Sequence, residues 1–280
     1  MPLTTLEEHA CFGGVQGFYE HASDVIGLPM RFGVYRPPQA AQGPVPVLYY
    51  LAGLTCNEQT FAIKAGAQRH AAEHGLMLVT PDTSPRNTGV AAAEKDWDFG
   101  VGAGFYLDAT QEPYARHWRM ESYVTEELPQ IVAQQFAAQP GAQGVFGHSM
   151  GGHGALTLAL RHPGLYRSVS ALAPICAPGQ VPWGRKAFTG YLGADQAEWA
   201  QHDAVQLIAG GARVPPLLVD QGLADQFLER ELRPELLQAA CTAAGQPLHL
   251  RRHDAYDHGY FFVASFMADH LLHHAQALRT

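Results

Sequence analysis

Ser149 is the residue of this sequence best placed to act as a nucleophile. It lies in the pattern Gly147-x-Ser149-x-Gly151, after the apolar residues 144–146. A strand that turns sharply into a helix holds its serine at strained backbone angles, and only glycine fits two positions to either side. Such a turn lifts the hydroxyl clear of the sheet and places the amide of Met150 where it can stabilise an oxyanion. The spacing therefore predicts acyl-transfer chemistry at Ser149.

His258 is the expected base. A serine hydroxyl is not ionised at neutral pH and needs a neighbouring base, for which the sequence offers 15 histidines. His258 stands out because it follows the last expected strand and directly precedes the last expected helix. His148 and His153 lie too close to Ser149 along the chain to take this role. The triad order of α/β-hydrolases then requires an acid between Ser149 and His258.

Two aspartates compete for the position of that acid. Asp225 is our choice, because Gly222 turns the chain after the expected strand and lets Asp225 reach over the edge of the sheet. Asp220, which closes that strand, remains the alternative. In such a triad the carboxylate fixes the imidazole tautomer and stabilises the imidazolium that forms when serine attacks.

The loop after the expected strand 47–51 should complete the site. Gly53 lets the backbone turn its amides inward, so we expect the amide of Leu54 to act with that of Met150 as an oxyanion hole. Cys56 lies in the same loop without a flanking base, so we interpret it as a thiol that lines the site and not as the nucleophile. Trp183 is the aromatic residue that we place next to the substrate, although such rings more often belong to the core.

Strands and helices alternate along the chain, which predicts an α/β fold with parallel pairing through right-handed crossovers. We expect a three-layer sandwich with a mainly parallel sheet and antiparallel N-terminal edge strands. The expected strands are 17–23, 30–36, 47–51, 76–82, 144–146, 166–173, 217–220 and 248–252. The expected helical segments are 60–74, 120–138, 155–160, an insertion ending near 209, 228–244 and 261–278, with Pro129 and Pro234 as breaks.

Composition narrows the class of protein. A chain of 280 residues that is 47% hydrophobic can form one domain, 1–280. Its net charge of −8 argues against nucleic acid as a partner, and no apolar run or signal peptide indicates a membrane. The scattered cysteines fit reduced thiols in the cytoplasm, and no spacing indicates a metal site or a cofactor. These cysteines are Cys11, Cys56, Cys176 and Cys241.

Long blocks of the sequence resemble the esterase D family of S-formylglutathione hydrolases. The resemblance extends over nearly the whole chain, in residues 51–61, 82–86, 96–110, 123–129, 147–156, 182–193 and 256–262. It implies the α/β-hydrolase fold, a triad of Ser149, Asp225 and His258, and oxyanion amides at Leu54 and Met150. The loops 87–93 and 111–118 depart from the family pattern, which leaves the acyl preference open.

The resemblance also implies a function. A serine hydrolase of this family would convert S-formylglutathione and water to glutathione and formate through a formyl-serine intermediate, in formaldehyde detoxification, without a cofactor. It is compatible with a homodimer. The cations that we expect near the glutathione moiety are Lys64, Arg86, Arg185 and Lys186. The alternative is a broad short-chain carboxylesterase or thioesterase, and less favoured alternatives are an acyltransferase and a non-catalytic binding protein.

Overall fold

One nine-stranded sheet runs through the computed structural model, which describes residues 2–279. Its order is β1-β2-β3-β5-β4-β6-β7-β8-β9. Strands β5, β4, β6, β7, β8 and β9 are parallel, whereas β1, β2 and β3 form an antiparallel edge on β5. The strands are β1 Leu3–Cys11, β2 Gly14–Ala22, β3 Pro29–Arg36, β4 Val45–Leu51, β5 Met77–Pro81, β6 Ala138–His148, β7 Ser168–Leu172, β8 Leu217–Gly222 and β9 Leu248–His253. The predicted fold class is confirmed.

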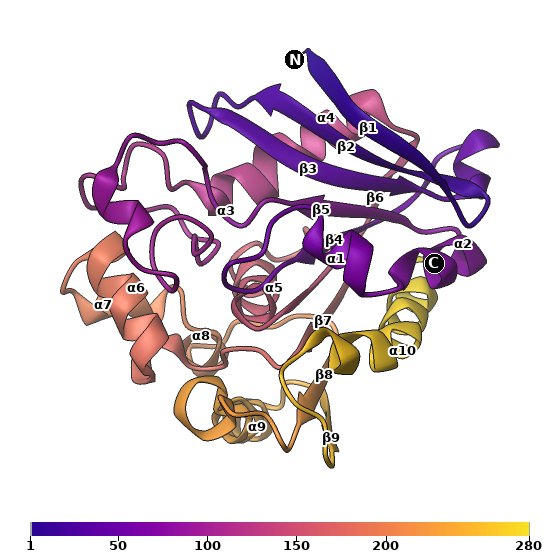
Figure 1. Ribbon diagram of the computed structural model, residues 1–280. Helices are drawn as coiled ribbons and strands as arrows, with labels where there is room; N and C mark the ends of the chain where they lie inside the picture. The colour runs from indigo at the N-terminus through magenta and orange to yellow at the C-terminus, as the bar shows by residue number, and fades with distance from the viewer. Residues whose placement is uncertain (1, 280) are drawn as a thin grey trace.

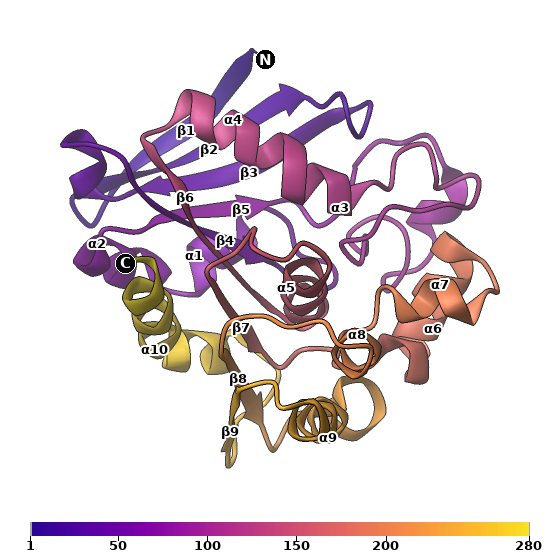
Figure 2. The same ribbon diagram turned by 180° about the vertical axis from the view of Figure 1, so that it is seen from behind.

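Helices cover both faces of this sheet (Figures 1 and 2). One face carries α1, α2 and α10, and the other carries α4, α5, α8 and α9, with α6 and α7 farther out. The helices are α1 Thr60–Lys64, α2 Ala67–His74, α3 Met120–Ser122, α4 Leu128–Gln135, α5 Met150–Arg161, α6 Pro182–Leu192, α7 Gln196–Ala200, α8 Ala204–Ala209, α9 Pro234–Ala244 and α10 Tyr260–Leu278. The molecule therefore has the expected three layers.

An aromatic cluster fixes the strand that leads to Ser149. Phe146 of β6 packs edge-on against Tyr50 of β4 at 4.9 Å between ring centroids, and Phe61 of α1 stacks on Tyr50 at 3.6 Å. All three rings are fully buried. Since burial of one such side chain stabilises the fold by about 1.5–3 kcal/mol, this cluster holds the end of β6 firmly against β4 and α1.

The observed structure of residues 120–138 differs from the predicted single helix in its interior and at its C-terminal end. A wide π-helical turn, Tyr123–Glu127, separates α3 from α4, and the amide of Leu128 reaches back to the carbonyl of Tyr123. Pro129 has no N–H to continue the regular pattern, so it lies in the first turn of α4, which agrees with the predicted break at this residue. The predicted end is wrong, because α4 ends at Gln135 and β6 already begins at Ala138.

Two other helical segments are divided, and one strand was missed. Gly66, at φ 65°, separates α1 from α2. A π-helical turn and Arg233, at φ 52°, precede Pro234 at the start of α9. Strand β1 escaped prediction because its side chains are mostly exposed on this edge of the sheet, so no apolar alternation marks it.

Candidate active site

Ser149 occupies the sharp turn between β6 and α5, where its backbone angles are φ 58° and ψ −119°. A left-handed φ on a residue with a side chain is strained, and such strain is concentrated at functional sites. A Cβ on Gly147 would lie 2.2 Å from the carbonyl oxygen of Gly151, and one on Gly151 would lie 1.9 Å from that of Leu51. Both glycines are therefore required for the turn to pack against β4.

The loops after β8 and β9 bring Asp225 and His258 to Ser149. The Nε2 atom of His258 lies 2.9 Å from Ser149 Oγ, and its Nδ1 atom lies 2.6 Å from Asp225 Oδ2. Ser149 and Asp225 are buried, whereas the side chain of His258 is 16% exposed. This linear arrangement lets an imidazole accept the proton of a serine hydroxyl while a carboxylate holds the second ring nitrogen.

Asp225 is held in place by its own loop. Its Oδ1 atom accepts the amide of Phe227 at 2.8 Å, and its Oδ2 atom accepts the side-chain amide of Gln221 at 3.3 Å. Gly222 allows this loop to approach the histidine loop, because a Cβ there would lie 2.4 Å from the carbonyl oxygen of Tyr256. The carboxylate therefore has a fixed orientation toward His258.

Asp220, the alternative acid, lies elsewhere. It is fully buried and binds Arg251 through both oxygens, at 2.6 and 2.5 Å, and His270 Nε2 at 3.2 Å. Burial opposes ionisation of Asp220, but the hydrogen bonds from His270 and Arg251 outweigh it and hold the pKa of its carboxyl below its usual range. The structure brings Asp225, and not Asp220, to His258.

The loop after β4 lies directly against Ser149. A Cβ on Gly53 would be 3.2 Å from the Cβ of Ser149. Within residues 2–279, neither the amide of Leu54 nor that of Met150 has an acceptor in the chain, and Met150 is the first residue of α5. Two free amides beside one serine, one of them at a helix N-terminus, form a suitable environment for an oxyanion.

Cys56 and Trp183 lie around this centre without contacting the Ser149 hydroxyl. Burial raises the pKa of the Cys56 thiol, although hydrogen bonds with Tyr260 and Thr60 act in the opposite direction, so it is a poor nucleophile. Trp183 is 8% exposed, and its ring lies 4.7 Å from that of Phe227. The ring of Phe227 therefore contacts both Trp183 and His258.

Two rings that sequence reasoning did not single out as partners contact His258. Phe227 packs edge-on at 5.0 Å between centroids, and His148 lies at 4.5 Å. Burial, with the nearby His258, lowers the pKa of His148 well below its usual value, so its ring stays neutral. Only the Asp225-x-Phe227 spacing, which is typical of an Asx turn, could have marked Phe227.

Three of the four expected cations are engaged with the protein itself. Arg86 is paired with Asp82 at 2.7 Å and donates to the carbonyl of Cys56 at 3.0 Å. Lys186 lies between two carboxylates, at 2.9 and 2.5 Å, and Arg185 donates to a backbone carbonyl at 3.1 Å. Those carboxylates belong to Asp96 and Asp98, and that carbonyl belongs to Gly179.

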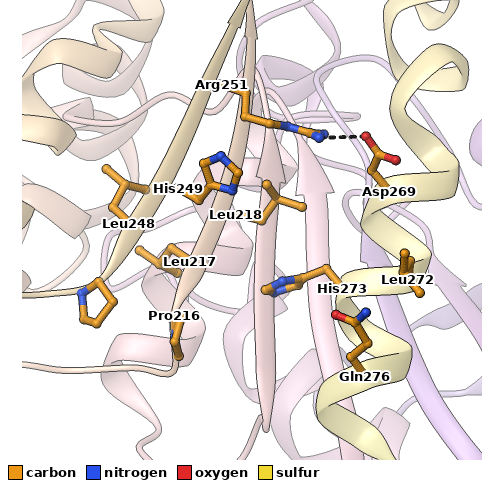
Figure 3. A pocket seen from close by; sticks show the side chains of 11 residues that line it. Pro216, Leu217, Leu218, Leu248, His249, Arg251, Asp269, Leu272, His273 and Gln276 are labelled. Atoms are coloured by element: carbon orange, nitrogen blue, oxygen red, sulfur yellow. Dashed lines mark hydrogen bonds and ion pairs between the residues drawn. The ribbon is translucent and has the colours of Figure 1, made fainter.

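A separate groove of about 620 Å³ lies between β8, β9 and α10 (Figure 3). Its walls include Leu217, Leu248 and His273, and the ion pair of Arg251 and Asp269 crosses it at 2.7 Å. None of its lining residues belongs to the Ser149 site. In the described part of the chain no cluster of three or more His, Cys, Asp or Glu side chains could hold a metal ion, and no helix is long and apolar enough to cross a membrane.

Known proteins are similar to this chain in sequence and fold. The family model described as "Putative esterase" matches residues 23–273. The S-formylglutathione hydrolase of Mus musculus is 50% identical and that of Paracoccus denitrificans 52%, with 99% and 98% of both chains covered. The solved S-formylglutathione hydrolase of Agrobacterium tumefaciens is 48% identical, has a TM-score of 0.95, and is matched over 98% of this chain and 99% of its own. The chain therefore belongs to the esterase family, in the group of S-formylglutathione hydrolases.

Proposed function

We propose that the protein hydrolyses S-formylglutathione to glutathione and formate. The observation that carries the proposal is the hydrogen-bonded series Ser149–His258–Asp225 on a strained turn, in a chain about half identical to S-formylglutathione hydrolases over its whole length. Such a reaction would serve the removal of formaldehyde that has combined with glutathione.

The proposed mechanism has two halves. Ser149 Oγ attacks the formyl carbonyl while His258 Nε2 takes its proton, and Asp225 stabilises the resulting imidazolium. The amides of Leu54 and Met150 stabilise the tetrahedral oxyanion. Collapse of this intermediate breaks the C–S bond, and the glutathione sulfur leaves with the proton from His258. Water, deprotonated by His258, then attacks the formyl-serine. The ester bond to Ser149 breaks, His258 returns the proton to Ser149 Oγ, and formate is released.

The leaving group suits this site. A thiol has a pKa of about 8.5, so its sulfur departs with little assistance, and His258 is needed mainly for Ser149 and the attacking water. Cys56 and Trp183 would line the surroundings of the substrate, with the thiol protonated. No cofactor or metal takes part in the proposed reaction.

Kinetics of the purified protein test the proposal. We expect kcat/KM for S-formylglutathione to exceed that for S-acetylglutathione and for a short p-nitrophenyl ester, and Ser149→Ala to abolish all three activities. Comparable rates on all substrates would instead support the second candidate, a broad short-chain esterase. Activity that persists in Ser149→Ala would refute the triad.

Two further proposals concern the setting of the enzyme. The free cysteines of the described chain fit a reducing compartment, so we propose a cytoplasmic location. We also propose a homodimer, with which the resemblance to the family is compatible; light scattering on the purified protein tests this.

A further inference from the structure

We propose that Lys64 binds a carboxylate of the glutathione moiety and thereby selects anionic thioesters over neutral esters. This inference rests on the proposed function. Glutathione carries two carboxylates and one ammonium group, so its thioesters are anionic. The protein also has a negative net charge, −8, and therefore repels such a substrate. A local positive charge near the catalytic residues would offset this repulsion.

Contacts between rings link Lys64 to the catalytic histidine. Its ammonium lies over the ring of Tyr260, 5.8 Å from the centroid. Tyr260 begins α10 two residues after His258, and its ring lies 5.9 Å from that of His148, which in turn lies 4.5 Å from His258. A cation–π contact of this kind holds the end of a flexible lysine in place without neutralising its charge.

Lys64 is also close to the oxyanion loop. It is the last residue of α1, the short helix that follows this loop, and its charge acts on the half-buried thiol of Cys56. Tyr260 contacts the same thiol and lies 3.3 Å from the hydroxyl of Tyr50 on β4. Lys64 is thus near both the loop that would hold the oxyanion and the loop that carries His258.

The charge of Lys64 is free, unlike those of Arg86 and Lys186. Its side chain is exposed, and within residues 2–279 it forms no ion pair. Arg185 also has no carboxylate partner there, but it lines a different hollow, with Trp199 and Asp203. Asp257, the carboxylate next to His258 in sequence, does not pair with Lys64 and instead accepts the amide of Gly259 at 2.9 Å.

Two exposed apolar side chains are next in sequence to the members of this cation–π pair. Phe261, which follows Tyr260, is 91% exposed, and Ile63, which precedes Lys64, is 71% exposed. These are the two most exposed large apolar side chains among the described residues. Exposed apolar side chains of this size are typical of surfaces that bind another molecule, which here would be the glutathione moiety.

Replacement of the charge tests this assignment. We expect Lys64→Met to lower kcat/KM for S-formylglutathione about fivefold through KM, since an exposed charge pair contributes on the order of 1 kcal/mol. Hydrolysis of neutral p-nitrophenyl acetate should be unchanged. Lys64→Arg should restore most of the loss, and high salt should reduce the difference between wild type and Lys64→Met.

Arg167→Met is the matched control, because Arg167 is an exposed cation just before the amino-terminal end of β7, whereas the site lies at the carboxyl ends of the strands. It should affect neither substrate. An equal loss on both substrates in Lys64→Met would assign Lys64 a structural role at the end of α1, and no loss on either would also overturn the proposal. A wild-type protein that does not hydrolyse glutathione thioesters would refute the proposed function itself.

Discussion

Asp220 and Asp225 belong to one segment of the chain, yet their carboxylates contact different groups. Asp225 holds the Nδ1 atom of His258, whereas Asp220 neutralises Arg251 inside the protein. We therefore expect Asp225→Asn to lower kcat by about 10⁴-fold with little change in stability, because an amide no longer stabilises the required tautomer and the imidazolium. Asp220→Asn should lower the free energy of unfolding by about 3–5 kcal/mol, since it removes the buried anion and leaves Arg251 paired only with the exposed carboxylate of Asp269.

Both variants are to be measured for esterase kinetics and for urea unfolding, so that each serves as the control for the other. Asp225→Asn should lose kcat, whereas Asp220→Asn should lose stability. If Asp220→Asn that remains folded were inactive, or if Asp225→Asn retained wild-type kcat, the assignment of the acid would be wrong.

The sequence predicted which residues would meet, but not everything that surrounds them. The glycine spacing indicated Ser149, and the order of strands and loops indicated Asp225 and His258, because the carboxyl ends of parallel strands lie at one edge of a sheet. It left Asp220 open, since the two acids differ in tertiary contacts that no local pattern records. The same reason hid the contact of His148 with His258.

At the scale of elements, the loop between β4 and α1 depends on its neighbours for its shape. The carbonyl of Cys56 accepts from the hydroxyl of Thr83 at 2.6 Å and from Arg86 at 3.0 Å, both of which follow β5. Tyr106 donates to the carbonyl of Ala52 at 2.9 Å. These contacts fix the backbone that carries the amide of Leu54. We call this set of hydrogen bonds the brace of the oxyanion loop, and the sequence alone did not predict it.

Thr83→Val removes one of these contacts while it keeps the shape of the side chain. We expect kcat to fall about fivefold with KM nearly unchanged, because the Leu54 amide is displaced slightly but not lost, and loss of a donor costs about 10²- to 10³-fold. Steady-state kinetics and thermal unfolding are the measurements.

Thr125→Val is the matched control, since the hydroxyl of Thr125 is also buried and donates to a helix carbonyl, that of Glu121, at 2.8 Å. Both variants should lose about 1 kcal/mol of stability, but only Thr83→Val should lose kcat. Equal kcat in the two variants would show that the brace does not act on the oxyanion loop.

At the scale of the whole molecule, the sheet joins residues from Leu3 to His253 into one layer, which supports the proposal of a single domain. Several of its histidines are enclosed by the helices and the sheet. Burial lowers the pKa of His153 to about 4 and that of His202 to about 3, and it lowers the pKa of His148 and His274 well below the usual value. These rings are neutral in the folded protein at neutral and mildly acidic pH.

This burial predicts how stability responds to acid. An unfolded chain protonates histidine near pH 6.5, so between about pH 6.5 and 4 it binds more protons than the folded protein, and stability falls as the pH falls. For His153 alone the loss at pH 5 is about 2 kcal/mol. We expect one unfolding transition by calorimetry, with a Tm that drops steeply from pH 7 to 5.

His153→Phe should flatten this dependence of Tm on pH. A phenylalanine ring suits this position, because the ring of His153 packs against Phe105 and Phe188. His9→Phe, the same replacement at an exposed position of β1, is the matched control and should keep the wild-type slope. An unchanged slope in His153→Phe would show that His153 does not contribute to acid unfolding.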